Sequence, residues 1–288
     1  MPLYWKCIVI SCRNEVLSLL LSALSWAVFD YIRKLLTQTF RPAVLAVVFA
    51  FLSLPAYFCY WLVSSAQLPV WQDYLVPALI SGSLAALGSV NYLSALQRGA
   101  ISKVIPILCL TPVVAAIAGW LILKEPLSFI QWSTVFGVSI LCAILSVRHF
   151  SLQGKALLPA LITAFSWGLC IVFDKIALKY SSVSFHLFFL TFCILALNWL
   201  ILRPKIPFEK IRKEKLIFIG VSFFVCAVAF QLVALVNIHP GILEAVKRAI
   251  GVVAALYIGY FAFKERVSLS QSLICAGLIL GVGILSFN

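Results

Sequence analysis

The feature that most constrains this chain is a series of apolar runs, each long enough to cross a bilayer as a helix. One crossing needs about 20 apolar residues. Runs of that length occupy 15–36, 42–64, 74–97, 101–123, 128–148, 156–178, 183–203, 214–237, 240–263 and 267–287. Only 11% of the 288 residues are charged, against about 25% in soluble domains. A soluble fold could not bury so much apolar surface, so we predict an all-α polytopic membrane protein with ten transmembrane helices.

The net charge of +13 does not indicate a nucleic-acid partner. Basic residues gather in short connectors and at the ends of apolar runs, most densely in 203–215, as is typical of the cytoplasmic loops of membrane proteins. The connectors that follow the odd-numbered runs are the more basic set. We therefore expect those connectors in the cytoplasm and both termini outside it. The expected partners are the lipid bilayer and a small-molecule substrate, and the oligomeric state stays open.

The sequence favours a protein that is not an enzyme. No P-loop, Gly-x-Ser-x-Gly or His-Glu-x-x-His motif occurs, and no hydrophilic segment is long enough for a catalytic or ATP-binding domain. The three histidines fall in different connectors or at run ends. The nine cysteines lie almost entirely within apolar runs and form no Cys-x-x-Cys pair, so we read them as small hydrophobic residues. We expect no metal, disulfide or cofactor.

The chain repeats itself at long range. Residues from Gly119 onward match those from Gly259 onward without a gap, and the matched polar positions are Lys124, Glu125, Ser128 and Gln131 with Lys264, Glu265, Ser268 and Gln271. Ser25-Trp26 likewise matches Ser166-Trp167. Chance similarity between apolar helices explains shared leucines, but poorly explains charged and amide residues in register. We predict two repeats of five helices, 1–150 and 151–288. Because five is odd, the repeats must be inverted relative to each other, as in many secondary transporters.

The motif Lys124-Glu125-Pro126-Leu127-Ser128, its second copy and Pro112 in the fourth run resemble the drug/metabolite transporter superfamily, in particular the ten-helix EamA-like permeases. The resemblance implies a central cavity lined by spans 1–4 and 6–9. It also implies a substrate drawn from amino acids, nucleotide sugars, sugar phosphates, cationic drugs and S-adenosylmethionine. In the second repeat Val252 occupies the position that matches Pro112, so we expect the ninth span to be straighter than the fourth.

The ninth run carries the strongest candidates for substrate binding. Glu244, Lys247 and Arg248 are spaced to share one helical face, and an ionisable group within a span costs about 2.5–3.5 kcal/mol on insertion scales. Lys247 or Arg248 would hold a carboxylate or phosphate, and Glu244 an amine. The alternative is an intrahelical Glu–Lys salt bridge near the membrane surface.

Four further residues join the predicted substrate site. Trp26 and Trp167 lie well inside their runs, where they would stack on a planar or cationic group or simply pack between helices. Asn91 and Gln231 lie at matching depths in spans 3 and 8, where each would contact substrate or bond a neighbouring helix.

Three other pairs of charged residues are not assigned to the substrate site. Asp30 and Lys34, four residues apart, are expected to pair with each other. Arg33 and Asp174 occupy equivalent repeat positions with opposite charge, which would allow a gating ion pair. Lys124 and Glu125 fall at a span end, where charges fix helix depth.

These features together predict an inner-membrane permease that works by alternating access. A site with both signs of charge and tryptophans suits an amino acid or an amino-acid or nucleoside derivative such as S-adenosylmethionine. The rival functions are a multidrug exporter and an exporter or antiporter of nucleotide sugars or phosphates.

Overall fold

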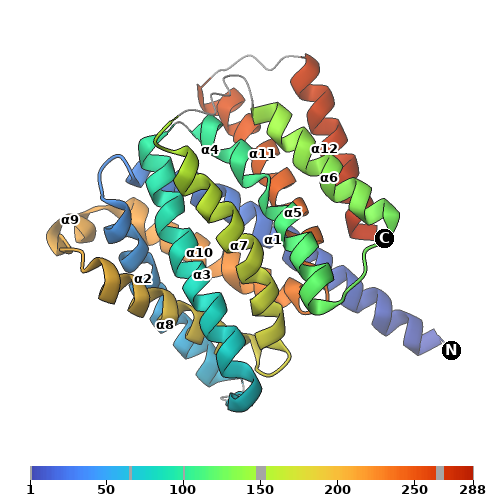
Figure 1. Cartoon of the computed structure of the whole chain (residues 1–288), viewed down its shortest axis with the longest axis horizontal. Helices are drawn as coiled ribbons and strands as arrows, with labels where there is room; N and C mark the ends of the chain where they lie inside the picture. The colour runs from blue at the N-terminus through green and yellow to red at the C-terminus, as the bar shows by residue number, and fades with distance from the viewer. Residues whose placement is uncertain (1, 65–66, 100, 147–153, 264–268, 288) are drawn as a thin grey trace.

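The computed structural model describes residues 2–64, 67–99, 101–146, 154–263 and 269–287, and within these ranges it contains helices and no strands (Figure 1). The first half supplies α1 (Pro2–Leu36), α2 (Pro42–Ser64), α3 (Trp71–Arg98), α4 (Ile101–Leu108), α5 (Thr111–Ala118), the π-helix η1 (Gly119–Leu123) and α6 (Phe129–Ser146). The second half supplies α7 (Leu157–Leu178), α8 (Val183–Leu202), the short α9 (Phe208–Lys213), α10 (Lys215–Leu235), α11 (Pro240–Phe263) and α12 (Leu269–Phe287).

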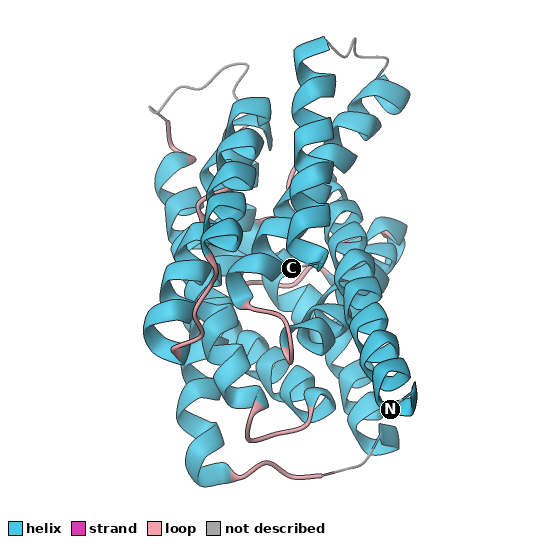
Figure 2. Ribbon diagram, turned by 90° about the vertical axis from the view of Figure 1, so that its right-hand side faces the viewer, coloured by secondary structure: helices cyan, strands magenta, loops and turns pink. Residues whose placement is uncertain are grey.

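Every predicted apolar run is helical over most of its length, and short loops join the helices (Figure 2). Six helices are long and apolar enough to cross a membrane by length and composition: Glu15–Leu36 within α1, then α2, α3, α7, α8 and α10. Shorter apolar helices cover Thr111–Leu123, Phe129–Ile144 and Leu269–Leu285. The structure therefore confirms an all-helical membrane architecture for the described residues, and the count of ten crossings stays a prediction.

The fourth predicted span is broken, whereas the ninth is not. Pro112 lies in the first turn of α5, where its missing N–H costs nothing, and the chain between α4 and α5 leaves the helix at Cys109 and Leu110. A π-helical turn then ends at Lys124, whose left-handed backbone (φ 55°) reverses the chain direction. In contrast, α11 runs unbroken from Pro240 to Phe263, as the presence of Val252 predicts.

The halves contact each other through pairs of helices from opposite repeats. The most extensive contacts join α3 to α7 and α8, α1 to α10 and α11, α2 to α8, and α5 to α7 and α11. Large apolar side chains such as Val63 and Phe129 stay exposed on the outside of the bundle. This outer surface suits lipid as the surrounding solvent, and the inter-repeat contacts place α1, α7, α10 and α11 around a shared interior.

Candidate functional site

A group of polar and aromatic side chains lies buried where α1, α3, α7, α10 and α11 meet, and we call it the central cluster. Helix α1 contributes three members at spacings of four and three, which place them on one helical face. Helix α11 contributes Glu244, Lys247 and Arg248 from its first three turns. The members are Trp26, Asp30, Arg33, Tyr92, Trp167, Gln231, Glu244, Lys247 and Arg248.

Gln231 joins the α1 and α11 parts of the central cluster. Its Oε1 atom accepts a hydrogen bond from Trp26 Nε1 at 2.8 Å and another from Lys247 Nζ at 3.0 Å. Lys247 also forms an ion pair with Glu244, and its ammonium lies 5.3 Å from the centre of the Trp26 ring. The expected Glu–Lys pair therefore forms, but it is buried within the protein, with Glu244 1% and Lys247 9% exposed.

Arg33 forms the second ion pair of the central cluster, and this corrects the predicted pairing of Asp30. Asp30 pairs with Arg33 rather than with Lys34. Lys34 instead donates to the carbonyl oxygens of Leu96 at 2.7 Å and Gly99 at 3.0 Å. The prediction failed because the last carbonyls of α3 lack helical partners and attract a cation, a competitor that the α1 sequence does not reveal.

Aromatic rings surround the Arg33 guanidinium. Its central carbon lies 4.3 Å from the centre of Phe29, 4.4 Å from Tyr92, 5.3 Å from Trp26 and 5.6 Å from Trp167. The two tryptophan rings lie 6.4 Å apart at 45°. These contacts hold the cation by cation–π attraction and leave the tryptophans within reach of one another across the two repeats.

Several buried polar atoms of the central cluster have no hydrogen-bond partner. They are Arg33 Nε, Tyr92 Oη, Glu244 Oε2 and Arg248 Nε, four of the six such side-chain atoms in the described part of the chain. Arg248 is 8% exposed, and no described carboxylate forms an ion pair with it. Buried polar groups normally find partners, so this concentration of unpaired donors and one acceptor marks the central cluster as the candidate binding site.

Of the predicted site residues, the structure brings six together and leaves one apart. Trp26, Trp167, Gln231, Glu244, Lys247 and Arg248 belong to the central cluster, whereas the Asn91 amide donates to the carbonyl of Leu87 in its own helix at 2.8 Å. The next residue, Tyr92, faces the cluster instead. A tyrosine within an apolar run carries no polar pattern of its own, so the sequence analysis missed it.

Arg33 and Asp174 do not meet, despite their equivalent repeat positions. Asp174 binds His186, whose Nε2 atom lies 3.0 Å from Asp174 Oδ1. His186 lies in the first turn of α8, at the end of a run as predicted, and it has no exposed surface.

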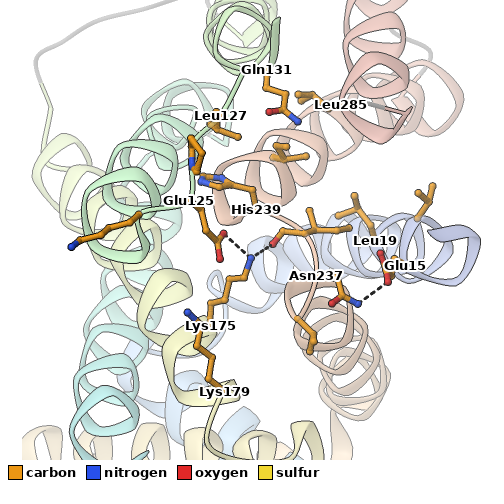
Figure 3. A pocket seen from close by; sticks show the side chains of 16 residues that line it. Glu15, Leu19, Glu125, Leu127, Gln131, Lys175, Lys179, Asn237, His239 and Leu285 are labelled. Atoms are coloured by element: carbon orange, nitrogen blue, oxygen red, sulfur yellow. Dashed lines mark hydrogen bonds and ion pairs between the residues drawn. The ribbon is translucent and has the colours of Figure 1, made fainter. Parts of the chain in front are cut away.

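A cavity of about 620 Å³ lies between residues of both repeats, and we call it the vestibule (Figure 3). Its walls come from α1, α6, α7, α11 and α12 and from the segments that follow η1 and α10. Lys175 Nζ reaches across it to Glu125 Oε2 at 2.8 Å and to the carbonyl of Ile238 at 3.1 Å. Glu125 thus ties the two repeats together; its second-half counterpart, Glu265, and the rest of 264–268 lie outside the described residues.

Two helices, α1 and α11, contribute residues to both the vestibule and the central cluster. It is lined by Leu19 of α1 and by Ile242 of α11, whereas Trp26 lies seven residues beyond Leu19 and Lys247 five residues beyond Ile242. At 1.5 Å per residue these intervals correspond to roughly 8–10 Å. Glu244 is only two residues beyond Ile242, so these cluster residues lie within about two helical turns of the vestibule wall.

His239, between α10 and α11, is the titratable wall residue whose protonation affects stability. Its Nδ1 atom accepts the Gly241 N–H at 3.1 Å, and burial lowers the pKa of His239 to about 4. In the unfolded chain the pKa returns to about 6.5, so below that value the unfolded state binds a proton that the folded state refuses. This contribution destabilises the fold as the pH falls from about 6.5 toward 4.

We therefore expect His239→Asn to lose less thermal stability on acidification than the wild type. Asparagine does not titrate, and its Oδ1 atom can accept the Gly241 N–H. Melting temperatures in detergent across that pH range provide the measurement, with each variant referred to its own value at pH 7. Parallel curves for the two proteins would show that His239 does not titrate differently on unfolding.

Within the described ranges, no three His, Cys, Asp or Glu side chains are placed to hold a metal ion. The seven cysteines from Cys59 to Cys275 are free thiols.

Comparison with known proteins gives two kinds of match. The model of the EamA-like transporter family matches residues 13–148 and, separately, residues 154–287. Among 28 matching chains of solved structures, one described only as "Crystal structure of protein" superposes with a TM-score of 0.72. That match covers 94% of this chain and 96% of the other at 15% sequence identity, so it shows a shared fold alone. No curated protein matches the sequence.

Proposed function

Because the chain belongs to the EamA-like transporter family, we propose that it is a secondary transporter of a small zwitterionic metabolite, an amino acid or an amino-acid or nucleoside derivative such as S-adenosylmethionine. The proposal places it in a cell inner membrane, where it alternates between states that open the central cluster to either side. The two repeats that meet around the cluster would rock against each other in this cycle.

The observation that carries the proposal is the set of unpaired buried atoms in the central cluster. Arg248 offers an uncompensated positive charge, which suits a carboxylate. Glu244 Oε2 offers an acceptor, which suits an ammonium group. A zwitterion satisfies both atoms at once, whereas a simple cation leaves Arg248 unpaired and a simple anion leaves Glu244 unpaired.

The tryptophans extend the match to larger derivatives. Trp26 and Trp167 present ring faces near the charged groups, and both already lie beside cations. The sulfonium of a bound ligand could make the same cation–π contact with a tryptophan ring, and an adenine could stack on the ring face. S-adenosylmethionine combines a carboxylate, an ammonium, a sulfonium and an adenine, and so it uses every feature of the cluster.

A panel of ligands tests the proposal by thermal stabilisation of the purified protein. It contains neutral amino acids, S-adenosylmethionine, a nucleotide sugar, a sugar phosphate and ethidium. We expect a zwitterionic ligand to raise the melting temperature, and Arg248→Gln to weaken its apparent affinity at least about tenfold, since hydrogen bonds to charged groups contribute about 1.5–3 kcal/mol. Lys179→Gln, which removes an exposed lysine from the vestibule, is the control and should retain binding.

The rival substrates predict different patterns in the same panel. A multidrug exporter would be stabilised by ethidium and would gain from the loss of Arg248. A transporter of nucleotide sugars or phosphates would respond to the anions, and its apparent affinity for them would be unchanged in Glu244→Gln. Uptake of the radiolabelled hit into proteoliposomes, compared with empty liposomes, then establishes transport itself.

A further inference from the structure

A second buried polar network lies where α3, α7 and α8 meet, outside the central cluster. Tyr74 Oη lies 3.0 Å from His186 Nδ1, and His186 Nε2 lies 3.0 Å from Asp174 Oδ1. The Ser81 hydroxyl also donates to Asp174. Tyr74, Ser81 and His186 have no exposed surface, and Asp174 is 2% exposed.

The partners fix where the hydrogens lie in this network. An ionised carboxylate only accepts, so His186 Nε2 must carry the hydrogen that it shares with Asp174. When His186 is neutral, its Nδ1 atom is then an acceptor and takes the hydroxyl hydrogen of Tyr74. Every group is paired in this state, and the four side chains together carry a charge of −1.

Adding one proton breaks this arrangement at a single point. The proton goes to His186 Nδ1, which changes from acceptor to donor, so the Tyr74 hydroxyl must turn and give its hydrogen to another acceptor. The net charge of the network becomes zero. The Ser181 hydroxyl, just after α7, is within reach of Tyr74 and can accept this hydrogen. Proton binding therefore moves the Tyr74 hydrogen bond from α8 to the chain that follows α7.

Few other charges influence the network among the described residues. The titratable groups that face it are Tyr74 from α3, Cys193 from α8 and Cys170 from α7, whose thiol lies 3.6 Å from Asp174 Oδ2. No described lysine or arginine pairs with Asp174. The charge of Asp174 is thus offset by hydrogen bonds, and a proton is the cation that can neutralise it.

One helix connects this network to both the vestibule and the central cluster. The residue after Asp174 is Lys175, which bridges the vestibule to Glu125. Seven residues before Asp174 on the same helix stands Trp167 of the central cluster. In addition, Val70 N–H donates to Tyr180 O at 2.9 Å and fastens the start of α3 to the end of α7. A change of hydrogen-bond partner at Tyr74 therefore acts on the end of α7, the helix that carries the Lys175–Glu125 bridge.

We propose that the Asp174–His186 pair is a proton-binding site whose occupancy opens and closes the vestibule, and hence that a proton is the coupling ion of the transporter. The coupling to solute rests on the proposed function, whereas proton binding and the vestibule response do not. In each cycle His186 Nδ1 takes one proton from one side of the membrane and releases it to the other.

The three histidines of the chain allow a direct test. The full-length protein is labelled with ¹⁵N in its histidine rings and studied by NMR in lipid nanodiscs, and His149→Gln, His186→Gln and His239→Asn assign the signals. His186 is the sensor. His239 is the reporter, because it lines the vestibule and its own pKa of about 4 keeps it neutral over the tested range.

We expect the signals of His186 and His239 to change with the same midpoint between about pH 5 and 8. In Asp174→Asn the shared midpoint should fall by about one pH unit or more, because the imidazolium loses its carboxylate. Asp73→Asn, which removes an exposed acid beside Tyr74, should leave it in place. If Asp174→Asn does not fold, His186→Gln carries the test, since it should hold the His239 signal constant across the range.

Two outcomes would overturn the proposal. His186 could show no titration in that range, or it could titrate while His239 stays unchanged. Either outcome would assign the pair a purely structural role. A failed ligand panel would count against the proposed solute and would leave the histidine result intact.

Discussion

Replacing Glu244 with glutamine should lower the free energy of unfolding by about 3–5 kcal/mol, the typical cost of removing one partner from a buried ion pair. Glu244 is almost fully buried and pairs with Lys247, and Arg248 follows one residue later without a described carboxylate partner. The central cluster holds two carboxylates and three basic groups, a net charge of +1. Loss of Glu244 raises this charge to +2 in a space that water hardly reaches.

A second substitution separates electrostatics from packing. In the Glu244→Gln, Lys247→Gln double variant the net charge returns to +1, so we expect at least half of the lost stability to return. Glu209→Gln on the exposed α9 is the control and should change stability by less than about 0.5 kcal/mol. Denaturant unfolding in mixed micelles measures all three. A double variant less stable than Glu244→Gln alone would show that the lysine side chain contributes mainly through packing and its bond to Gln231.

The same electrostatics connects stability to function. A site that binds a zwitterion must keep charged groups ready in the absence of substrate, and each such group is costly within a membrane. The cluster limits this cost by pairing Lys247 with Glu244 and Arg33 with Asp30, and by placing aromatic rings around Arg33. Arg248 is the group left without a counter-charge, which is why its substitution should affect ligand binding more than folding.

The helix positions were predictable because lipid imposes a simple pattern on the sequence. Apolar runs placed α2 at 42–64 and α11 at 240–263, and the spacing of three and four in α11 placed its ionisable residues on one buried face. The repeat identified the family, which the two matched segments confirm. The apolar runs and the residue spacings depend on neighbouring residues alone, and the repeat is found by comparing the two halves of the sequence.

What could not be predicted depends on contacts between distant helices. Lys34 binds the end of α3 instead of Asp30. His186 lies at a run end as predicted, but the sequence does not show that Asp174 and Tyr74 meet it there from two other helices. The break in the fourth span is similar, since Pro112 permits a new helix start without requiring the preceding helix to end. Asn91 and Tyr92 are neighbours on α3, and only the packing decides which of them faces the central cluster.

Gly241→Ala should be the most damaging single methyl addition in the inter-repeat contact, with a loss of about 3 kcal/mol in the free energy of unfolding. A Cβ atom at Gly241 would lie 2.5 Å from Ala116 Cβ, 2.7 Å from Ala116 Cα and 3.0 Å from Ala116 N. Two of these are backbone atoms of α5, so no side-chain rotation relieves the clash and the helices must separate.

Gly251→Ala is the matched control, because it adds the same methyl group to the same helix where no described atom lies within 4 Å of the new Cβ. Alanine favours helix over glycine by about 1 kcal/mol, so this variant should be neutral or more stable than the wild type. Thermal or denaturant unfolding compares the two directly. Equal effects would mean that α5 and α11 do not approach this closely.

The contact also bears on transport, since α5 and α11 belong to opposite repeats and Gly241 follows the vestibule residue His239 by two positions. If the repeats rock about this close crossing, Gly241→Ala should slow solute exchange in proteoliposomes. The rate per molecule of folded protein should then be lower than that of the wild type.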